Sequence, residues 1–228
     1  REDITYISQP YNLAEVKKLQ EKAGIKIART IHYPFEKFPC LRDIIPVKEN
    51  PSLDLAYGGT MRGNKRKKKM VKFYFGYPSD LRVQMFGKMN EEILRKTADK
   101  HFSKDLTPPE YSGPVDYSEF MNKMNDCVSH VVIGDPWYEG NDMPQRCYES
   151  IWSNVITFID DELDPQRRVY GDCKISKILY VKDQKDVEQK LKRILSKEGL
   201  REKILELQFN AVNFNAKSYC TDFVSLLK

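Results

Sequence analysis

Residues 57–70 place two adjacent glycines between an apolar segment and a basic one. The preceding segment, Leu53–Tyr57, has the apolar character of a short buried strand, and the following segment, Met70–Phe75, carries apolar residues at helical spacing. Gly58 and Gly59 are therefore predicted at a strand-to-helix turn. Glycine adopts backbone angles that are closed to other residues and lets a ligand approach the main chain. Because a helix start also offers free N–H groups and a positive dipole end, the turn predicts an anion site.

Three side chains near this turn strengthen the prediction. Thr60 supplies a hydroxyl group, and Arg62 and Arg66 would share a helix face if the helix begins early enough. Guanidinium groups suit a diphosphate. Neither of the two common glycine-rich phosphate-loop patterns is present, so a plain turn with a solvated basic face stays open as the alternative. The basic run at 65–69 has the same two interpretations, a surface that tracks a DNA backbone or a solvated helix face.

Composition limits the class of protein. The chain has 228 residues, which allows one large or two small domains, and its 40% hydrophobic and 11% aromatic residues exclude a disordered chain. A net charge of +5 fits a polyanionic partner without requiring one. The 5 scattered cysteines predict free thiols in a reducing compartment. With no long apolar run and a polar start, the sequence predicts a soluble intracellular protein that does not enter a membrane.

Predicted strands and helices alternate along the chain, which indicates a mainly parallel sheet covered on both faces. Ligands bind at the carboxyl ends of the strands in such sheets. The predicted strands span 4–7, 25–31, 53–57, 81–86, 130–133, 155–159 and 178–181. The predicted helices span 10–23, the basic run to 75, 116–127 with Asp116 and Glu119 as caps, 144–153, 184–196 and 199–227. Prolines place a domain boundary between residues 34 and 52, and residues 103–114 are predicted as a loop.

A second cluster follows the strand at 130–133. Asp135 could face a nucleotide or a metal, or cap the next turn. Arg146 and Glu149 lie three residues apart on a predicted helix. They form either an ordinary surface ion pair, or a second diphosphate clamp with a carboxylate that accepts hydrogen bonds from a ribose diol.

Two further groups carry weaker signals. An acidic cluster after the strand at 155–159 could bind a cation or begin a helix. It comprises Asp160, Asp161, Glu162 and Asp164. The histidines lack metal-ligand spacing and are interpreted as structural; they are His32, His101 and His130.

The order and spacing of these motifs resemble the DNA β-glucosyltransferase family of T-even bacteriophages. No single motif is specific, but the likeness runs from about Ile4 to beyond Phe209. The residues that carry it are 54–60, Arg62, Arg66, Met70, Val71, Phe86, Gly87, 132–135, Tyr138, Arg146, Glu149 and 159–162.

The resemblance implies a GT-B fold, in which two Rossmann-like α/β domains face each other across a cleft. It implies inverting transfer of a sugar from a UDP-sugar to 5-hydroxymethylcytosine in double-stranded DNA. UDP-glucose is the first candidate donor and another sugar such as arabinose the second, with Mg²⁺ as a further candidate. By resemblance, the donor is bound by Gly59, Thr60, Arg62, Arg66, Phe86, Gly87, Val115, Asp135, Tyr138, Arg146 and Glu149. The diphosphate would lie against the arginines and the base against Phe86, Gly87 and Val115.

The resemblance also implies a division of the chain. Residues 1–34 match the end of the family's amino-terminal domain, 35–52 a linker, 53–198 the UDP-sugar domain, and 199–228 a helix that returns toward the first domain. The family's catalytic base lies in the first half of the amino-terminal domain, so no base is assigned here. We expect a fragment rather than a naturally short relative, acting as a monomer in the cytoplasm of the infected cell. The alternative is a non-catalytic DNA-binding or regulatory relative that keeps the donor domain.

Overall fold

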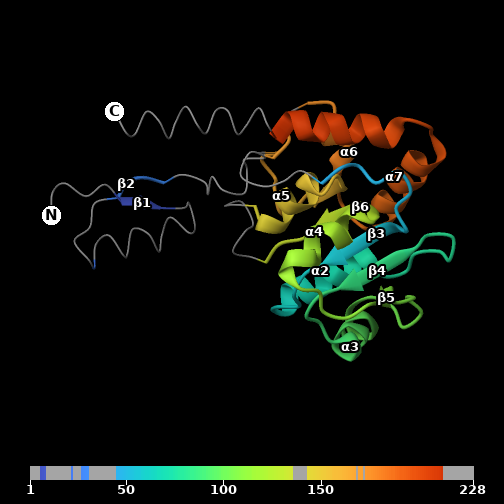
Figure 1. The fold of residues 1–228 in the computed structure, drawn as a ribbon. Helices are drawn as coiled ribbons and strands as arrows, with labels where there is room; N and C mark the ends of the chain where they lie inside the picture. The colour runs from blue at the N-terminus through green and yellow to red at the C-terminus, as the bar shows by residue number, and fades with distance from the viewer. Residues whose placement is uncertain are drawn as a thin grey trace.

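The computed structural model describes residues 6–8, 22, 27–30, 45–135, 143–167, 169–171 and 173–212. Its centre is a 6-stranded sheet in the order β5-β4-β3-β6-β7-β8, with every neighbouring pair parallel (Figure 1). The strands are β3 (Leu53–Gly58), β4 (Val83–Phe86), β5 (Glu110–Tyr111), β6 (Cys127–Val132), β7 (Ile156–Asp160) and β8 (Tyr180–Val181). The predicted parallel α/β sheet is confirmed.

Helices cover both faces of this sheet. They are α2 (Asn64–Tyr74), α3 (Glu91–His101), α4 (Tyr117–Asn125), α5 (Gln145–Trp152), α6 (Ser176–Leu179) and α7 (Gln184–Ser196), and residues 200–212 are also helical. α2 packs beside α3 and α7, whereas α4 packs beside α5. Right-handed crossovers place these two groups on opposite faces, so β3 and β6 at the centre are buried from both sides.

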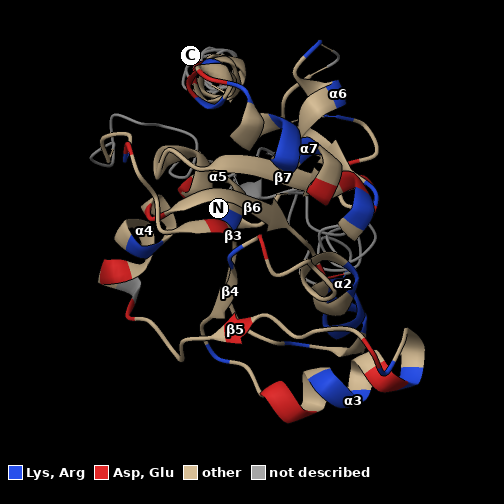
Figure 2. Cartoon of the chain, turned by 90° about the vertical axis from the view of Figure 1, so that its right-hand side faces the viewer, with Lys and Arg blue, Asp and Glu red and all other residues tan. Residues whose placement is uncertain are grey.

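Local sequence explains where several helices begin. The Asp183 side chain accepts a hydrogen bond from the Asp186 amide (3.0 Å) and caps α7, which buries Val187 and Leu191 one turn apart. The Asn90 side chain caps α3 in the same way. Figure 2 shows charges of both signs along α3, where pairs four residues apart, such as Lys96 with Glu92 (2.6 Å), stabilise an exposed helix.

Two short strands near the amino terminus pair in parallel. β1 (Tyr6–Ser8) and β2 (Ile27–Thr30) lie within the strands predicted at 4–7 and 25–31, with β1 one residue longer at its end. The helix predicted at 10–23 lies outside the described residues except for Lys22, which is helical. Residues 45–52 have no helix or strand, and the division of the chain into domains stays a prediction. Of the helix predicted at 199–227, residues 200–212 are helical and the rest lies outside the described residues.

Several predicted boundaries are wrong. α3 was not expected, because it buries only Leu94 and Ala98 and shows a weak apolar pattern. Residues 178–179, predicted as strand, belong to α6, since a short apolar run fits either structure. The loop predicted at 103–114 contains the edge strand β5. Asp116 stands at the start of α4, but its side chain makes no capping hydrogen bond.

Candidate functional site

The strand order reverses between β3 and β6. From β3 the chain proceeds to β4 and β5 on one side, and it then returns to β6, β7 and β8 on the other side. In open parallel sheets, ligands bind in the crevice at such a reversal, outside the carboxyl ends of the strands. A cavity of about 290 Å³ lies at this position. Its lining comes from residues 57–60 after β3, from Arg62 and Arg66, from His130, Val132 and Ile133 on β6, and from Pro144 and Arg146.

The crevice forms because β3 and β6 separate before either strand ends. Their last pair is Ala56 with His130, although each strand continues for two more residues. Beyond this point the Tyr74 hydroxyl of α2 accepts a hydrogen bond from the Val131 amide (2.8 Å) and donates one to the Val131 carbonyl (2.7 Å). A side chain of α2 therefore satisfies the backbone groups of β6 where β3 has moved away.

His130 lies at the floor of the cavity as a neutral imidazole. Its Nδ1 is 2.9 Å from the Ala56 carbonyl oxygen, so Nδ1 carries the proton and donates. Burial lowers the pKa of His130 to about 4, a shift that the Ala56 hydrogen bond opposes and the charge of Arg146 increases. The structural role predicted for this histidine fits its bond to Ala56, but its place in the cavity was not foreseen.

The glycine turn is crowded on three sides. A Cβ atom at Gly58 would lie 2.4 Å from the Phe120 ring, and one at Gly59 would lie 2.9 Å from the Tyr57 hydroxyl. A Cβ atom at Gly87, where φ is 116°, would fall 1.9 Å from the Gly59 carbonyl oxygen. Neither Gly58 nor Gly59 has a positive φ. Crowding rather than an unusual backbone angle therefore requires the two glycines, which corrects the reason inferred from sequence.

The amino terminus of α2 points its free amides into this region. The helix begins after Gly63 (φ 56°), without a side-chain cap and without an acidic residue in its first turn. Its first N–H groups and its dipole are thus available to an anion. Arg62 precedes the helix, so the expectation that it shares a helix face with Arg66 is wrong. Both arginines nevertheless line the cavity.

Arg66 is held by the turn and by β6. Its Nη1 donates to the Thr60 carbonyl (3.3 Å) and lies 3.5 Å from Asp135 Oδ2. Its Nε is buried without a hydrogen-bond partner. Asp135 therefore balances part of this charge, and one buried N–H of the guanidinium is left to a ligand.

Arg146 approaches from the other face of the sheet. Its guanidinium lies 3.5 Å from the centre of the Phe120 ring, and its Nη1 is 2.7 Å from Glu149 Oε2. The Glu149 side chain is only 2% exposed, so the interpretation as an ordinary surface pair is wrong. Glu149 orients Arg146 toward the cavity, and its role toward a ribose stays a prediction.

The residues expected around a base lie beside the turn. Phe86 is fully buried, and its ring packs 5.6 Å from that of Phe120. The Gly87 amide donates to the Gly113 carbonyl (2.8 Å). Val115 packs against the same cluster and borders a second, more open depression of about 560 Å³. Their contact with a ligand stays a prediction.

Two predicted features differ in standing. Tyr138 lies outside the described residues. Tyr57, which was not selected, lines the cavity. Its place immediately before the two glycines, at the carboxyl end of a buried strand, is the signal that would have identified it.

The basic run and the acidic cluster contact each other. Lys69 is 5% exposed, and its Nζ lies 2.5 Å from Asp160 Oδ2, while Lys72 Nζ is 3.3 Å from Glu162 Oε1. Residues 161–163 form a turn, so the predicted helix start is wrong. These acids balance lysines of α2 instead. Lys65 and Lys68 are exposed, which leaves the DNA-contact interpretation open for them.

Across the ranges that the structure describes, no three His, Cys, Asp or Glu side chains gather as a metal cluster. A search of the same ranges for a helix long and apolar enough to cross a membrane finds none.

Comparison with known proteins places these features among glycosyltransferases. The chain is 24% identical over 216 residues to the DNA beta-glucosyltransferase of Enterobacteria phage T4, a match that covers 92% of this chain and 57% of that protein. A crystal structure of the T4 phage enzyme with UDP and Mn²⁺ has a TM-score of 0.74 and 24% identity, over 96% of this chain and 60% of that one. *S. aureus* TarM with UDP has a TM-score of 0.53 and 11% identity, over 97% and 43%. No protein-family model matches the chain.

The chain thus spans less than two thirds of the length of these relatives. The resemblance seen in the sequence is confirmed by the T4 enzyme, and the GT-B type of fold by the structural neighbours.

Proposed function

We propose that this chain is the donor-binding part of a glycosyltransferase that moves a sugar from a UDP-sugar to DNA. One observation carries the proposal: Arg62, Arg66 and Arg146 line a single cavity at the reversal of the strand order. The uncapped start of α2 adds free amides there. Guanidinium groups and a helix amino terminus together suit a diphosphate.

The relatives supply the identity of the donor. A structure of the T4 phage enzyme with its UDP-glucose substrate has 24% identity and a TM-score of 0.74 to this chain. We therefore assign UDP-glucose or a related UDP-sugar as the donor. The predicted residues Thr60, Arg62, Arg66 and Arg146 would contact the diphosphate.

Each group has a distinct part in the proposed reaction. The arginines bind the donor and stabilise the negative charge that grows on the departing UDP, a large term in many enzymes. Glu149 and the Phe120 ring orient Arg146. We propose direct displacement with inversion, in which the hydroxymethyl oxygen of a modified cytosine attacks the anomeric carbon. No residue of this chain is assigned as the base.

A divalent ion would have a limited contact with this chain. Asp135 is a carboxylate beside the cavity, 3.5 Å from Arg66. Mg²⁺ and Mn²⁺ are commonly held by one or two carboxylates together with substrate phosphates. Asp135 with the diphosphate fits that pattern, and the ion would add positive charge to the leaving group.

The donor site is tested by titration calorimetry with UDP. We expect Arg62→Ala and Arg146→Ala each to weaken UDP binding roughly tenfold or more, since each removes a charge-assisted contact. Lys68→Ala is the matched control, because Lys68 is exposed on α2 and does not line the cavity. Equal affinity in all four proteins would refute the donor assignment.

The acceptor is tested by mass spectrometry of nucleosides from hydroxymethylcytosine-containing duplex DNA, incubated with the protein and a panel of UDP-sugars. A hexose or pentose added to the modified base would establish transfer and name the sugar class. Salt-sensitive duplex binding without transfer would instead favour a DNA-binding or regulatory relative.

A further inference from the structure

Tyr57 lies deep in the donor cavity at the carboxyl end of β3. Its side chain is 4% exposed and lines the cavity together with Arg66 and Arg146. The ring is fixed by two neighbours, an edge contact with Tyr74 at 5.2 Å and a tilted contact with His130 at 6.1 Å between ring centres. The hydroxyl therefore has a defined position in the cavity.

The hydrogen bonding of Tyr57 differs from that of the other buried tyrosines. The hydroxyl groups of four of them donate to protein acceptors at 2.5–2.9 Å. These are Tyr74, Tyr77, Tyr170 and Tyr180. The Tyr57 hydroxyl makes no hydrogen bond to any residue that the structure describes. Buried tyrosine hydroxyl groups normally have a partner, so this exception needs an explanation.

The surroundings of this hydroxyl indicate which partner it would have. Burial raises the pKa of Tyr57, the charges of Arg66 and Arg146 lower it, and Asp135 raises it, so the phenol is neutral with these three groups around it. The hydroxyl also lies under the Gly59 peptide, where a Cβ atom would come within 2.9 Å of it. A neutral O–H between two guanidinium groups can only donate to a group that the same arginines attract, which is an anion.

We propose that the Tyr57 hydroxyl donates a hydrogen bond to a phosphate oxygen of the bound nucleoside diphosphate. This inference rests on the proposed function and adds a binding residue to it. Tyr57 would supply a fixed, uncharged donor on the floor of the site, whereas the arginines supply the charge. It also gives Gly59 a second role, since any larger residue would displace this hydroxyl.

The test compares Tyr57→Phe with Tyr77→Phe. Both remove one buried hydroxyl, but the Tyr77 hydroxyl donates to the Phe73 carbonyl (2.8 Å) away from the cavity. We expect Tyr57→Phe to weaken UDP and UDP-glucose binding equally, by roughly tenfold, with an unchanged melting temperature. Tyr77→Phe should lower the melting temperature and leave UDP binding unchanged.

Three other outcomes would count against the inference in distinguishable ways. Unchanged UDP affinity in Tyr57→Phe would overturn it while the proposed function stands. A loss for UDP-glucose alone would also overturn it, because the hydroxyl would then contact the sugar. Failure of the unmodified protein to bind UDP would refute the proposed function, and the inference would fall with it.

Discussion

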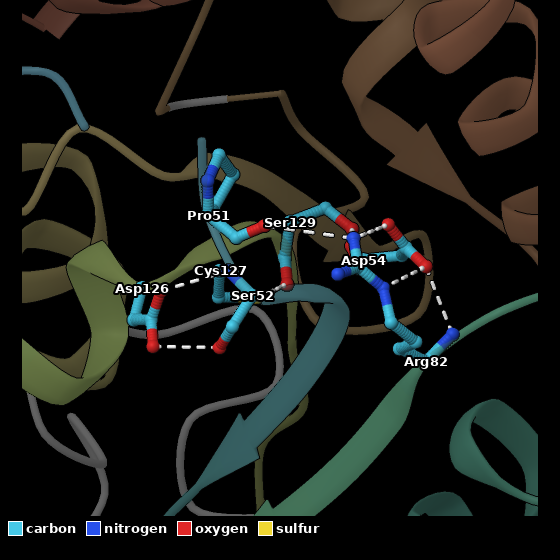
Figure 3. A network of polar contacts seen from close by, with 7 residues as sticks. All are labelled: Pro51, Ser52, Asp54, Arg82, Asp126, Cys127 and Ser129. Carbon is cyan, nitrogen blue, oxygen red and sulfur yellow. Dashed lines mark hydrogen bonds and ion pairs between the residues drawn. The ribbon is translucent and has the colours of Figure 1, made fainter. Parts of the chain in front are cut away.

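The two ends of the central strands use charge in opposite ways. At the amino-terminal end, Asp54 accepts hydrogen bonds from the Arg82 amide (2.8 Å) and from its guanidinium Nη2 (2.9 Å) (Figure 3). Nearby, Asp126 accepts from the Ser52 amide (2.8 Å) and hydroxyl (2.6 Å) and pairs with Lys48 at 2.5 Å. Each acid at this end is matched by donors from the protein itself.

At the carboxyl end, three arginines face two acids. Arg66 lies near Asp135 and Arg146 near Glu149, while Arg62 is exposed and makes no ion pair within the described ranges. Both ends have the same strands and similar residues. The difference indicates that the amino-terminal charges stabilise the fold, whereas the carboxyl-terminal charges are arranged for an anion.

The largest effect should come from a pair at the carboxyl edge that does not face the cavity. Lys69→Met would leave Asp160 buried without its 2.5 Å partner, which should lower the free energy of unfolding by about 3–5 kcal/mol. Urea denaturation measures this loss. The double variant Lys69→Met with Asp160→Leu should recover most of it, since no unpaired charge remains. A single variant as stable as the parent would break the comparison, because charges at this edge would then not need partners.

Acid should reveal the neutral histidine under the cavity. The pKa of His130 is about 4 in the fold and 6.5 ordinarily, so the unfolded chain binds a proton first as the pH falls. The free energy of unfolding should therefore decrease between pH 6.5 and pH 4, by up to about 3 kcal/mol. Denaturation at several pH values measures the slope. His130→Gln should remove this part of the slope, and an unchanged slope would contradict the assignment.

The amino-terminal network should give a smaller loss. Asp54→Ala removes the acceptor of both Arg82 hydrogen bonds and should cost about 1–3 kcal/mol in the free energy of unfolding. Arg82→Ala should cost less, because the Arg82 side chain is 58% exposed and its backbone amide keeps Asp54. UDP binding should not change in either variant, and a loss of affinity would connect the two ends.

The smallest effect on stability should come from the ligand side. Arg62→Ala should change the free energy of unfolding by less than about 0.5 kcal/mol, because Arg62 is exposed. Its loss of UDP affinity should nevertheless be clear. Measuring both quantities on one sample sharpens the comparison, since Asp54→Ala should give the reverse result.

The sequence predicted the parallel order and the elements with strong patterns. α7 matches its predicted range of 184–196 because capping and apolar spacing agree. The strand, glycine turn and basic helix also appear as predicted. α3 was missed because few of its residues are buried, and the strand at 178–179 was wrong because a short apolar run has no decisive period.

The site was predicted in part. The positions of Thr60, Arg62, Arg66 and Arg146 around one cavity follow from their places after strand ends. The buried position of Lys69 could not be predicted, because it has basic neighbours on both sides and its partner Asp160 lies far along the chain. Tyr57 was missed because an aromatic residue in a strand usually signals core, and only its unmatched hydroxyl distinguishes it.

The Tyr74 hydroxyl that separates β3 from β6 has a consequence for recognition. It takes both backbone groups of Val131, so the opening between the strands is built during folding rather than created by the ligand. A donor that enters this opening does not have to break strand pairing. The ordering entropy is spent when the chain folds, and more of the contact energy is then expressed as affinity.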